Sequence, residues 1–322
     1  MTILLITPGS TVRHSGNRCT ASQWADLLKQ QGHTVIVCYD IPGTFPIANA
    51  DLLIAMHGAK CHDVIACYRS LTPAGKVLLA LTGTDIYPEP SEATHESMAW
   101  ADGIIVLQEK ALEKVPREFH VKSTVVIQSV QAKMKRPARK SGSFEVCVVG
   151  HFREVKNPLL TASASRLLPP ESRLRVRHAG GILEPKFGDL VAREQQENPR
   201  YQWLGELSSK SVAELLVSSD LMVLTSHSEG GARVIGEAIV HGTPVLSTRI
   251  DGILGLLGES YPGFFPDNDK TSLATLLWKC ESDPSFYASL QEAADSCSAR
   301  FDPKAEAHAL REALAKLSTV KP

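Results

Sequence analysis

The chain reads SHSEGGARVIGEA from Ser226 to Ala238, directly after the apolar run Asp220–Thr225 and shortly before the segment HGTPVLS at His241–Ser247. The two flanking segments have the length and composition of short buried strands, and the stretch between them contains a Gly-Gly pair at Gly230-Gly231. This order predicts a strand, turn, helix, turn, strand unit of a parallel α/β sheet. In such sheets ligands bind at the carboxyl ends of the strands.

Two glutamates frame the turn and the helix of this unit. Backbone N–H groups of Gly230, Gly231 and Ala232 are expected to approach a sugar phosphate at a helix N-terminus. Glu229 would then face the sugar. If the helix begins at about Gly231, Glu237 lies roughly two turns and ~12 Å further, which suits a ribose beyond a diphosphate. Alternatively, Glu237 is an exposed helix residue and Glu229 a first-turn acid that complements the helix dipole.

The same alternation of apolar runs and helical stretches extends over the chain. Since 322 residues exceed the comfortable size of one hydrophobic core, two doubly wound domains are expected, at 1–137 and 144–302. Strands are predicted in the first domain at Ile3–Ile6, Thr34–Tyr39, Asp51–Met56, Lys76–Leu81, Gly103–Leu107 and Thr124–Ile127. They are predicted in the second at Phe144–Val149, Leu174–His178, Tyr201–Leu204, Asp220–Thr225, Pro244–Ser247 and Gly263–Phe265. Helices are predicted at Asn17–Gln31, Cys61–Leu71, Thr271–Glu281, Pro284–Arg300 and Pro303–Leu317.

Between these domains lies the basic segment Lys133–Ser143, which contains Pro and Gly and lacks an apolar face. These features favour a solvated linker, placed at 138–143, over a membrane-binding amphipathic helix.

Charge and cysteine usage narrow the class of function. The formal net charge is −1, from 34 basic and 35 acidic side chains. The chain therefore lacks the excess of basic residues that is typical of nucleic-acid-binding proteins, and a small-molecule substrate is expected. Seven cysteines without C-x-x-C spacing indicate reduced thiols in a cytoplasm. Met1–Ile6 lacks a basic leader and no apolar run approaches the ~18 residues that span a bilayer. A cytoplasmic protein without stable membrane association or cofactor is expected.

The segment Ser226–Ser247 resembles the donor site of GT-B glycosyltransferases, particularly family four, whose pattern is S-x-x-E-G followed by E-A and G-x-P-V. Tyr201–Gly205 resembles an earlier strand of that family, and Gly150 with Lys156 resembles the G-x5-K signature that opens its second domain. The resemblance implies an α/β GT-B fold, two Rossmann-like doubly wound parallel-sheet domains facing across a cleft. It also implies that the last helix, within 303–322, crosses back to the first domain.

A narrower resemblance comes from several segments taken together, namely Gly16–Ala21, Leu81–Tyr87, Gly150–Pro158, Arg249–Gly258 and Tyr261–Gly263. In these segments the chain is similar to the selenosugar synthases of selenoneine biosynthesis, GT-B enzymes that join selenophosphate to the sugar of a UDP-sugar. This resemblance implies a UDP-N-acetylglucosamine or UDP-glucose donor, a selenophosphate acceptor and release of UDP.

The loop GHFREVK at Gly150–Lys156 follows a predicted strand and precedes a helical stretch. Arg153 and Lys156 are therefore expected to stabilise the departing diphosphate without a metal. They could instead be solvated residues at a helix start, but two cations there would be poorly placed without an anion. Family four usually carries arginine directly after the glycine, where this chain has His151, so Lys156 is the safer assignment.

The segment LTGTDI at Leu81–Ile86 resembles L-H-G-T-D-I of family four, where the histidine contacts the sugar near the reacting centre. This chain has Thr82 there, and Thr84 and Asp85 complete the candidate substrate-binding set. Selenium in selenophosphate is already anionic near neutral pH, so no base would be needed. His57, directly after another apolar run, could take over the polar role, or be an ordinary loop histidine.

The loop between the first predicted strand and helix, Pro8–Arg18, is glycine-rich and basic. It could hold an anionic acceptor or be a flexible solvated loop, since it matches no standard phosphate-binding pattern. Its candidate substrate-binding residues are Gly9, Arg13, His14, Asn17 and Arg18.

No metal site is predicted. His57–His62 with Cys61 has no distant partner pair for zinc, and Asp267-Asn268-Asp269 is typical of a turn and helix N-cap, although it resembles the D-x-D motif of other glycosyltransferases. Three other functions remain open: a conventional glycosyltransferase with an alcohol or thiol acceptor, a UDP-sugar epimerase or hydrolase, and a non-catalytic nucleotide-sugar sensor.

Overall fold

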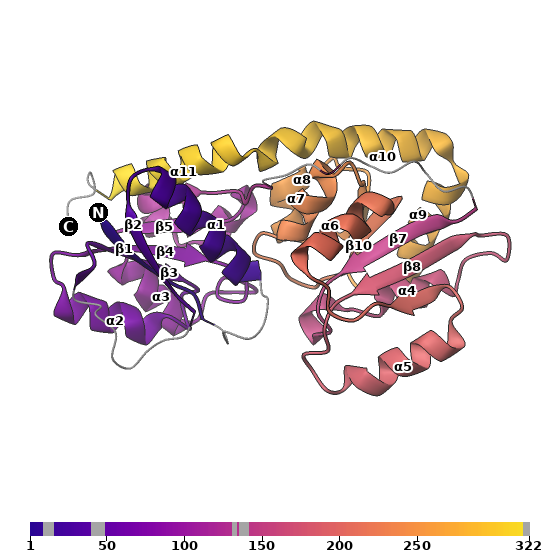
Figure 1. Cartoon of the computed structure of the whole chain (residues 1–322), viewed down its shortest axis with the longest axis horizontal. Coiled ribbons are helices and arrows are strands. Elements are labelled where there is room, and N and C mark those ends of the chain that lie inside the picture. The colour runs from indigo at the N-terminus through magenta and orange to yellow at the C-terminus, as the bar shows by residue number, and fades with distance from the viewer. Residues whose placement is uncertain (9–15, 40–48, 131–133, 135–141, 318–322) are drawn as a thin grey trace. The chain divides into compact units, whose positions relative to one another are not determined.

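The computed structural model describes the whole chain except residues 9–15, 40–48, 131–133, 135–141 and 318–322. The chain forms two compact units, which we call unit 1 (Met1–Ser129 with Pro303–Pro322) and unit 2 (Val130–Asp302) (Figure 1). The chain passes from unit 1 to unit 2 after Ser129, earlier than the expected residue 137. Most of the expected linker 138–143 lies outside the described residues.

The sheet of unit 1 has six parallel strands in the order β2-β1-β3-β4-β5-β6. All residues of β3 and all but the first of β4 are buried, because helices cover both faces of a parallel sheet and demand continuous apolar runs. The strands are β1 Thr2–Ile6, β2 Thr34–Cys38, β3 Leu52–Met56, β4 Lys76–Leu81, β5 Gly103–Val106 and β6 Ser123–Val125. Each predicted strand of this unit is confirmed to within two residues.

Two helices pack on each face of this sheet. Helices α1 (Gly16–Gln30) and α11 (Pro303–Lys316) share one apolar cluster with alternate residues of the strands. Helices α2 (His62–Leu71) and α3 (Glu92–Trp100) share the other. Helix α3 is absent from the sequence prediction because small and polar residues fill most of its buried face. Two short 3₁₀ helices, η2 (Glu109–Lys114) and η3 (Arg117–Lys122), complete the unit.

A buried carboxylate holds α11 against the rest of unit 1. Glu306 is 2% exposed and accepts a hydrogen bond from Trp24 Nε1 at 2.9 Å. It also accepts from the Ser129 backbone N–H at 3.1 Å, from the Ser129 hydroxyl at 2.6 Å and from the Gln23 side-chain amide. The last residue of the first segment of unit 1 is thereby joined to the helix that returns from residue 303, which explains why the unit ends at Ser129 and not at the basic segment.

The sheet of unit 2 is also parallel, in the order β12-β11-β10-β7-β8-β9. The strand order reverses between β7 and β10, and such a switch point leaves room for a ligand at the carboxyl ends of the two strands. The strands are β7 Phe144–Val149, β8 Leu174–Ala179, β9 Tyr201–Trp203, β10 Leu221–Leu224, β11 Val245–Thr248 and β12 Phe264–Phe265. The predicted strands of this unit are likewise confirmed.

Two helices of unit 2 begin at an aspartate that caps the helix N-terminus. Asp269 accepts hydrogen bonds from the backbone N–H groups of Thr271 and Ser272, which confirms the predicted N-cap. Asp283 caps the next helix in the same way. The helices are α4 Leu160–Ser165, α5 Phe187–Glu197, α6 Ser209–Ser218, α7 Arg233–Val240, α8 Asp251–Leu257, α9 Lys270–Ser282 and α10 Pro284–Cys297, with 3₁₀ helices η4 Glu154–Lys156 and η5 Ser298–Phe301.

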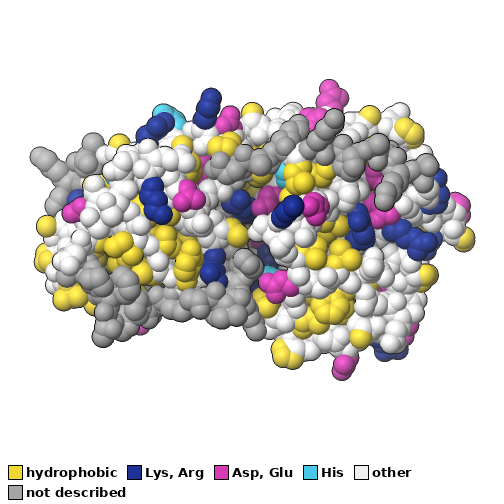
Figure 2. Space-filling view, in the orientation of Figure 1, with side chains coloured by type: hydrophobic (Ala, Val, Ile, Leu, Met, Phe, Trp, Pro, Cys, Tyr) yellow, Lys and Arg dark blue, Asp and Glu magenta, His cyan; other side chains and the backbone are white. Residues whose placement is uncertain are grey.

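The surface agrees with the near-neutral charge balance. On the face shown in Figure 2, basic and acidic side chains are interspersed and form no continuous field of one sign. Within the described residues, no helix combines the length and the hydropathy that a membrane crossing would require.

Candidate functional site

The loops that follow β7 and β10 lie side by side at the switch point of unit 2. The Thr225 hydroxyl lies 2.9 Å from the carbonyl oxygens of both Lys156 and Asn157. The backbone N–H of His227 donates to the Val155 carbonyl at 2.9 Å. These contacts hold the Gly150–Lys156 loop against the Ser226–Glu229 loop, although the two are about seventy residues apart in sequence.

Lys156 and Glu229 form an ion pair across these loops, with Nζ and Oε1 2.6 Å apart. The Ser226 hydroxyl donates to the same oxygen at 2.6 Å. The Glu229 side chain is 10% exposed and that of Lys156 29%, so the carboxylate is largely shielded from solvent and the lysine is partly accessible. These two residues were expected to bind different parts of the donor, and the structure brings them into direct contact.

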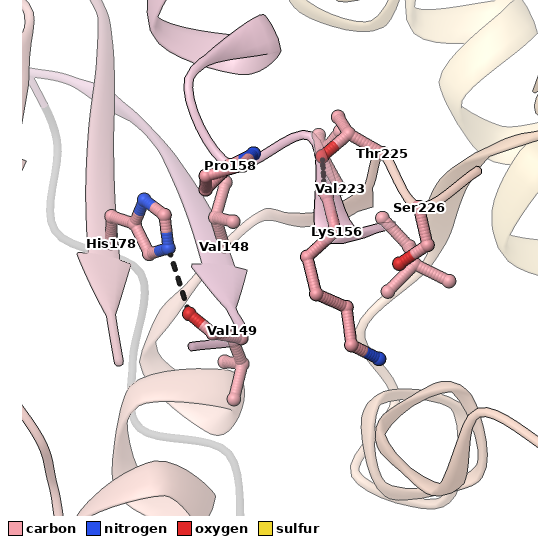
Figure 3. Close-up of a pocket in the computed structure, with 10 residues that line it drawn as sticks. Val148, Val149, Lys156, Pro158, His178, Val223, Thr225 and Ser226 are labelled. Carbon is pink, nitrogen blue, oxygen red and sulfur yellow. Dashed lines mark hydrogen bonds between the residues drawn. The ribbon is translucent and has the colours of Figure 1, made fainter. Parts of the chain in front are cut away.

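A small pocket lies beneath this pair, between the carboxyl ends of β7, β8 and β10. Figure 3 shows Lys156 with Thr225 and Ser226 on one side of it and His178 on the other. The pocket is lined by Val148, Val149, Gly150, Lys156, Pro158, His178, Val223, Leu224, Thr225 and Ser226.

His178 contacts the Gly150–Lys156 loop, and no role for this residue was predicted from the sequence. Its ring is fully buried and stacks on Phe152 at 4.3 Å between centroids. Nε2 lies 3.0 Å from the Gly150 carbonyl and Nδ1 3.0 Å from the Tyr201 hydroxyl. Burial lowers the pKa of His178 to about 4, so the ring is neutral near pH 7, donates from Nε2 and accepts at Nδ1. His178 therefore positions the backbone of Gly150.

Arg153 and Lys156 lie in a loop between β7 and α4, as expected, but this loop contains the short helix η4, with Arg153 as its N-cap and Lys156 as its last residue. Asn157 then adopts a left-handed conformation at φ 42°, and α4 begins only at Leu160. Lys156 is therefore not at a helix N-terminus, where the dipole would disfavour a cation. Arg153 is exposed, while His151 Nδ1 accepts from the Gly181 backbone N–H at 3.0 Å and links this loop to the one after β8.

The helix that carries Glu237 begins later than expected. Helix α7 starts at Arg233 with Ala232 as its N-cap, so Glu237 lies about one turn into it and not two. Gly230, Gly231 and Ala232 are buried in the turn before the helix. Glu237 is half-buried and its Oε1 accepts from Arg233 Nε at 2.9 Å. The carboxylate is therefore neither fully exposed nor unpaired.

A glycine supports the loop of Glu229 from behind. A Cβ at Gly252, in the first turn of α8, would lie 1.9 Å from the Glu229 carbonyl oxygen. No residue other than glycine fits without moving the backbone that carries the carboxylate.

If unit 2 binds a UDP donor, as the sequence resemblance implies, Gly252→Ala is expected to raise the KM or Kd for that donor by about 10-fold, because displaced site residues lose binding geometry. The measurement is UDP affinity by titration calorimetry. Gly188→Ala is the matched control, since a Cβ there meets nothing within 4 Å. Equal affinities for both variants would contradict the supporting role of Gly252.

In unit 1, Asp85 is buried and faces the protein backbone. Its Oδ1 accepts from the N–H groups of Thr82 at 2.9 Å and Gly83 at 2.8 Å. Its Oδ2 accepts from the Gly58 N–H at 2.9 Å. Asp85 was predicted to bind substrate, but these contacts show a carboxylate that fastens the loop after β3 to the loop after β4.

Other predicted residues of unit 1 gather around Asp85. His57 is 5% exposed and has the unusual backbone angle φ 96°. Its Nε2 lies 3.0 Å from the Thr84 hydroxyl, and its Nδ1 accepts from the Lys60 backbone N–H at 3.3 Å. Asn17, in the first turn of α1, donates to the Thr82 hydroxyl at 3.1 Å. The candidate residues of three separate segments thus form one polar cluster at the carboxyl end of the sheet.

The remaining candidates of unit 1 are placed differently. The Arg18 guanidinium lies over the Tyr39 ring, 4.4 Å from its centroid. Gly9, Arg13 and His14 lie outside the described residues. Within the part of the chain that the structure describes, no three His, Cys, Asp or Glu side chains are grouped as metal ligands would be.

Comparison with known families gives a match in unit 2. The model of the family described as "Glycosyl transferases group 1" matches residues 129–296. Among curated proteins, the D-inositol 3-phosphate glycosyltransferase of Corynebacterium urealyticum is 26% identical over 181 residues, 53% of this chain and 43% of that protein. The N-acetyl-alpha-D-glucosaminyl L-malate synthase of Bacillus anthracis is 27% identical over 151 residues, 45% of this chain and 38% of that protein. The chain thus spans about half, or less, of the length of these relatives.

Solved structures match over nearly the full chain. Anabaena Alr3699/HepE in complex with UDP-glucose superposes with a TM-score of 0.80 at 18% identity, covering 99% of this chain and 100% of that one. The sucrose-phosphate synthase of Thermosynechococcus elongatus superposes with a TM-score of 0.77 at 16% identity, with coverage of 99% and 100%. At these identities the likeness establishes the fold, and the predicted arrangement of two Rossmann-like parallel-sheet domains of GT-B type is confirmed.

Proposed function

The chain belongs to the glycosyl transferases group 1 family, and from this premise we propose that it joins the selenium of selenophosphate to the sugar of a UDP-sugar. The donor would be UDP-N-acetylglucosamine or UDP-glucose. Selenium attacks the anomeric carbon, the bond from that carbon to the diphosphate oxygen breaks, and UDP leaves with the electron pair. Water then cleaves the phosphorus–selenium bond and releases a 1-seleno-sugar and phosphate.

The observation that carries the donor half of this proposal is the contact of Lys156, Ser226 and Glu229 at the β7/β10 switch point. A partly accessible cation beside a shielded carboxylate suits a ligand that combines a diphosphate with a sugar. The likeness in fold to a protein crystallised with UDP-glucose supports the same class of donor.

Each donor group would meet a different part of this site. Lys156 would turn from Glu229 to the diphosphate and, with Arg153, stabilise the charge that develops as UDP departs. Glu229, released from the ion pair, would accept from sugar hydroxyls. The amides of Gly230 to Ala232 would bind phosphate oxygens, and Glu237 the ribose. These cations and amides would serve in place of a metal.

The acceptor half of the proposal rests on the chemistry of unit 1. The histidine typical of family four is replaced by Thr82, and both ring nitrogens of His57 are engaged within the protein. Burial lowers the pKa of His57, an effect that the nearby Asp85 carboxylate partly opposes. A neutral histidine that already uses both nitrogens is a poor base for an alcohol, whereas an anionic selenium needs none.

The direct test is incubation of the protein with UDP-N-acetylglucosamine or UDP-glucose and selenophosphate, with chelator present. The expected result is UDP and a sugar product that shows the selenium isotope pattern in mass spectrometry. Consumption of UDP-sugar without an acceptor would indicate a hydrolase or epimerase. Consumption only with an alcohol or thiol would indicate a conventional glycosyltransferase, and binding without turnover a nucleotide-sugar sensor.

Glu237→Ala is expected to weaken binding of UDP-sugar by about 10-fold or more, since a hydrogen bond to a charged acceptor contributes about 1.5–3 kcal/mol. Calorimetric titration with UDP measures this without any acceptor. Glu197→Ala removes a similar arginine–glutamate pair from α5, where Arg193 Nε and Glu197 Oε1 are 2.7 Å apart, and should bind UDP normally. If both variants bind UDP as the parent does, the ribose assignment is wrong.

A further inference from the structure

Two threonine hydroxyls in the loop after β4 each receive a hydrogen bond from a nitrogen donor. Asn17 Nδ2 lies 3.1 Å from the Thr82 hydroxyl oxygen, and His57 Nε2 lies 3.0 Å from the Thr84 hydroxyl oxygen. The two donors come from α1 and from the end of β3. We call Thr82 and Thr84 the threonine pair.

The direction of the His57 hydrogen bond follows from its other nitrogen. The Lys60 backbone N–H can only donate, so Nδ1 of His57 accepts this bond at 3.3 Å and carries no proton. The proton of the neutral ring is then on Nε2, which donates to Thr84. An amide nitrogen likewise only donates, so Thr82 accepts from Asn17.

A hydroxyl that accepts a bond keeps its own proton for another partner. Among the described residues, no side chain or carbonyl accepts a hydrogen bond from either threonine hydroxyl. Thr84 is exposed and Thr82 half-buried, so both protons are accessible to a ligand. The threonine pair therefore offers donors and is suited to a ligand rich in acceptor atoms.

The charges around the threonine pair are compatible with binding of an anion. The first turn of α1, which supplies Asn17, contains no acidic residue, and a helix N-terminus favours negative charge. Asp85 is the acidic side chain of the cluster, but three backbone N–H groups bind its carboxylate, and its side chain is 0% exposed. Its charge is directed into the loops and away from solvent.

We propose that the threonine pair binds the oxyanion group of the acceptor, and that His57 is a positioning residue that holds Thr84 as a donor. This inference rests on the proposed function and deepens it. It assigns a binding site to the oxyanion group of the acceptor, and it gives His57 a positioning role in place of the role of a base. The backbone of His57 supports this view, because a residue held at φ 96° is constrained by its surroundings.

The test of the pair uses the full chain, inorganic thiophosphate as the probe and titration calorimetry as the readout. Thr84→Val, which keeps the shape and removes the donor, is expected to weaken thiophosphate binding by about 10-fold. Thr84→Ser restores the hydroxyl and should bind within about 2-fold of the parent. Thr82→Val and Thr82→Ser form a second matched set. UDP affinity should be unchanged in all four, which controls for folding.

The proposal is overturned if the parent binds no thiophosphate, if Thr84→Val and Thr84→Ser bind it equally, or if UDP affinity falls in parallel. Because binding is measured without turnover, the result is independent of whether selenophosphate is consumed. Hydroxyl-dependent thiophosphate binding without turnover would refute the proposed reaction and leave the oxyanion site standing.

The role of His57 is tested by His57→Asn, since asparagine tolerates positive φ better than most residues. A positioning role predicts a rise of about 10-fold in the KM for selenophosphate with kcat reduced less than about 5-fold. A general base would instead lower kcat by about 100-fold or more. The second pattern, or an unchanged KM, would overturn the positioning role.

Discussion

In the proposed reaction, replacing Lys156 with methionine is expected to lower kcat/KM for the UDP-sugar by about 10²–10³-fold, because the variant loses one preorganised charge at the departing oxyanion. Lys156 is the cation that the structure places beside Glu229 at the switch point, with Nζ and Oε1 2.6 Å apart. The rate of UDP release measures the effect on turnover. The affinity for UDP measures how much of this effect is due to weaker binding in the ground state.

Lys186→Met is the matched control for this variant. Lys186 also pairs with glutamates of unit 2, Glu154 and Glu184, but its side chain is 54% exposed and its surface pairs contribute little. Its removal should leave kcat/KM within about 2-fold of the parent. A Lys156→Met enzyme that keeps more than about a tenth of kcat/KM would show that Lys156 serves only to hold Glu229.

Replacing Glu306 with alanine is expected to lower the free energy of unfolding of unit 1 by about 3–5 kcal/mol. The change leaves the Trp24 indole N–H and both donors of Ser129 buried without this acceptor, and it removes one of the acceptors of the Gln23 amide, which keeps the Ser129 carbonyl oxygen. Urea denaturation followed by fluorescence measures the loss, and the Trp24 indole is a local reporter of the same contact.

Two further variants sharpen this experiment. Glu312→Ala removes an exposed carboxylate of the same helix, paired with His308 at 3.4 Å, and should change the free energy by less than about 0.5 kcal/mol. Glu306→Gln keeps an acceptor for some of the donors and should fall between the two. If Glu306→Ala unfolds at the same urea concentration as Glu312→Ala, the buried network does not hold α11.

The strands were predictable because their physics is local. A parallel strand covered by helices on both faces must be apolar at nearly every position. A run such as Lys76–Leu81 can therefore be recognised as a strand without knowing which strands lie beside it. The N-cap at Asp269 was predictable for the same reason, since the cap and the amides that it binds are adjacent in sequence. Helix α3 was missed because its buried residues Thr94 and Ser97 resemble surface residues.

Local reasoning misplaced the start of α7 and did not predict the short helix η4. Glycines mark a turn, but the residue at which helical hydrogen bonds begin depends on how the turn packs, here two residues after Gly231. Asn157 in a left-handed conformation ends η4 before α4 can begin, and its side chain donates to Asn268 in the distant loop after β12. That partner could not be identified from the sequence around residue 157.

The amino-acid sequence by itself determined the parallel α/β class, the two-domain organisation, the position of nearly every strand and the segments that carry chemistry, since each depends on residues close together in the chain. Only the tertiary structure decided which of those segments meet. Lys156 pairs with Glu229 because β7 and β10 are neighbours in the sheet, and Asp85 joins Gly58 because β4 lies beside β3. Glu306 reaches Ser129 because α11 packs on β5 and β6. Strand order and helix packing depend on the free energy of the complete fold. Such pairings therefore cannot be derived from spacing along the chain.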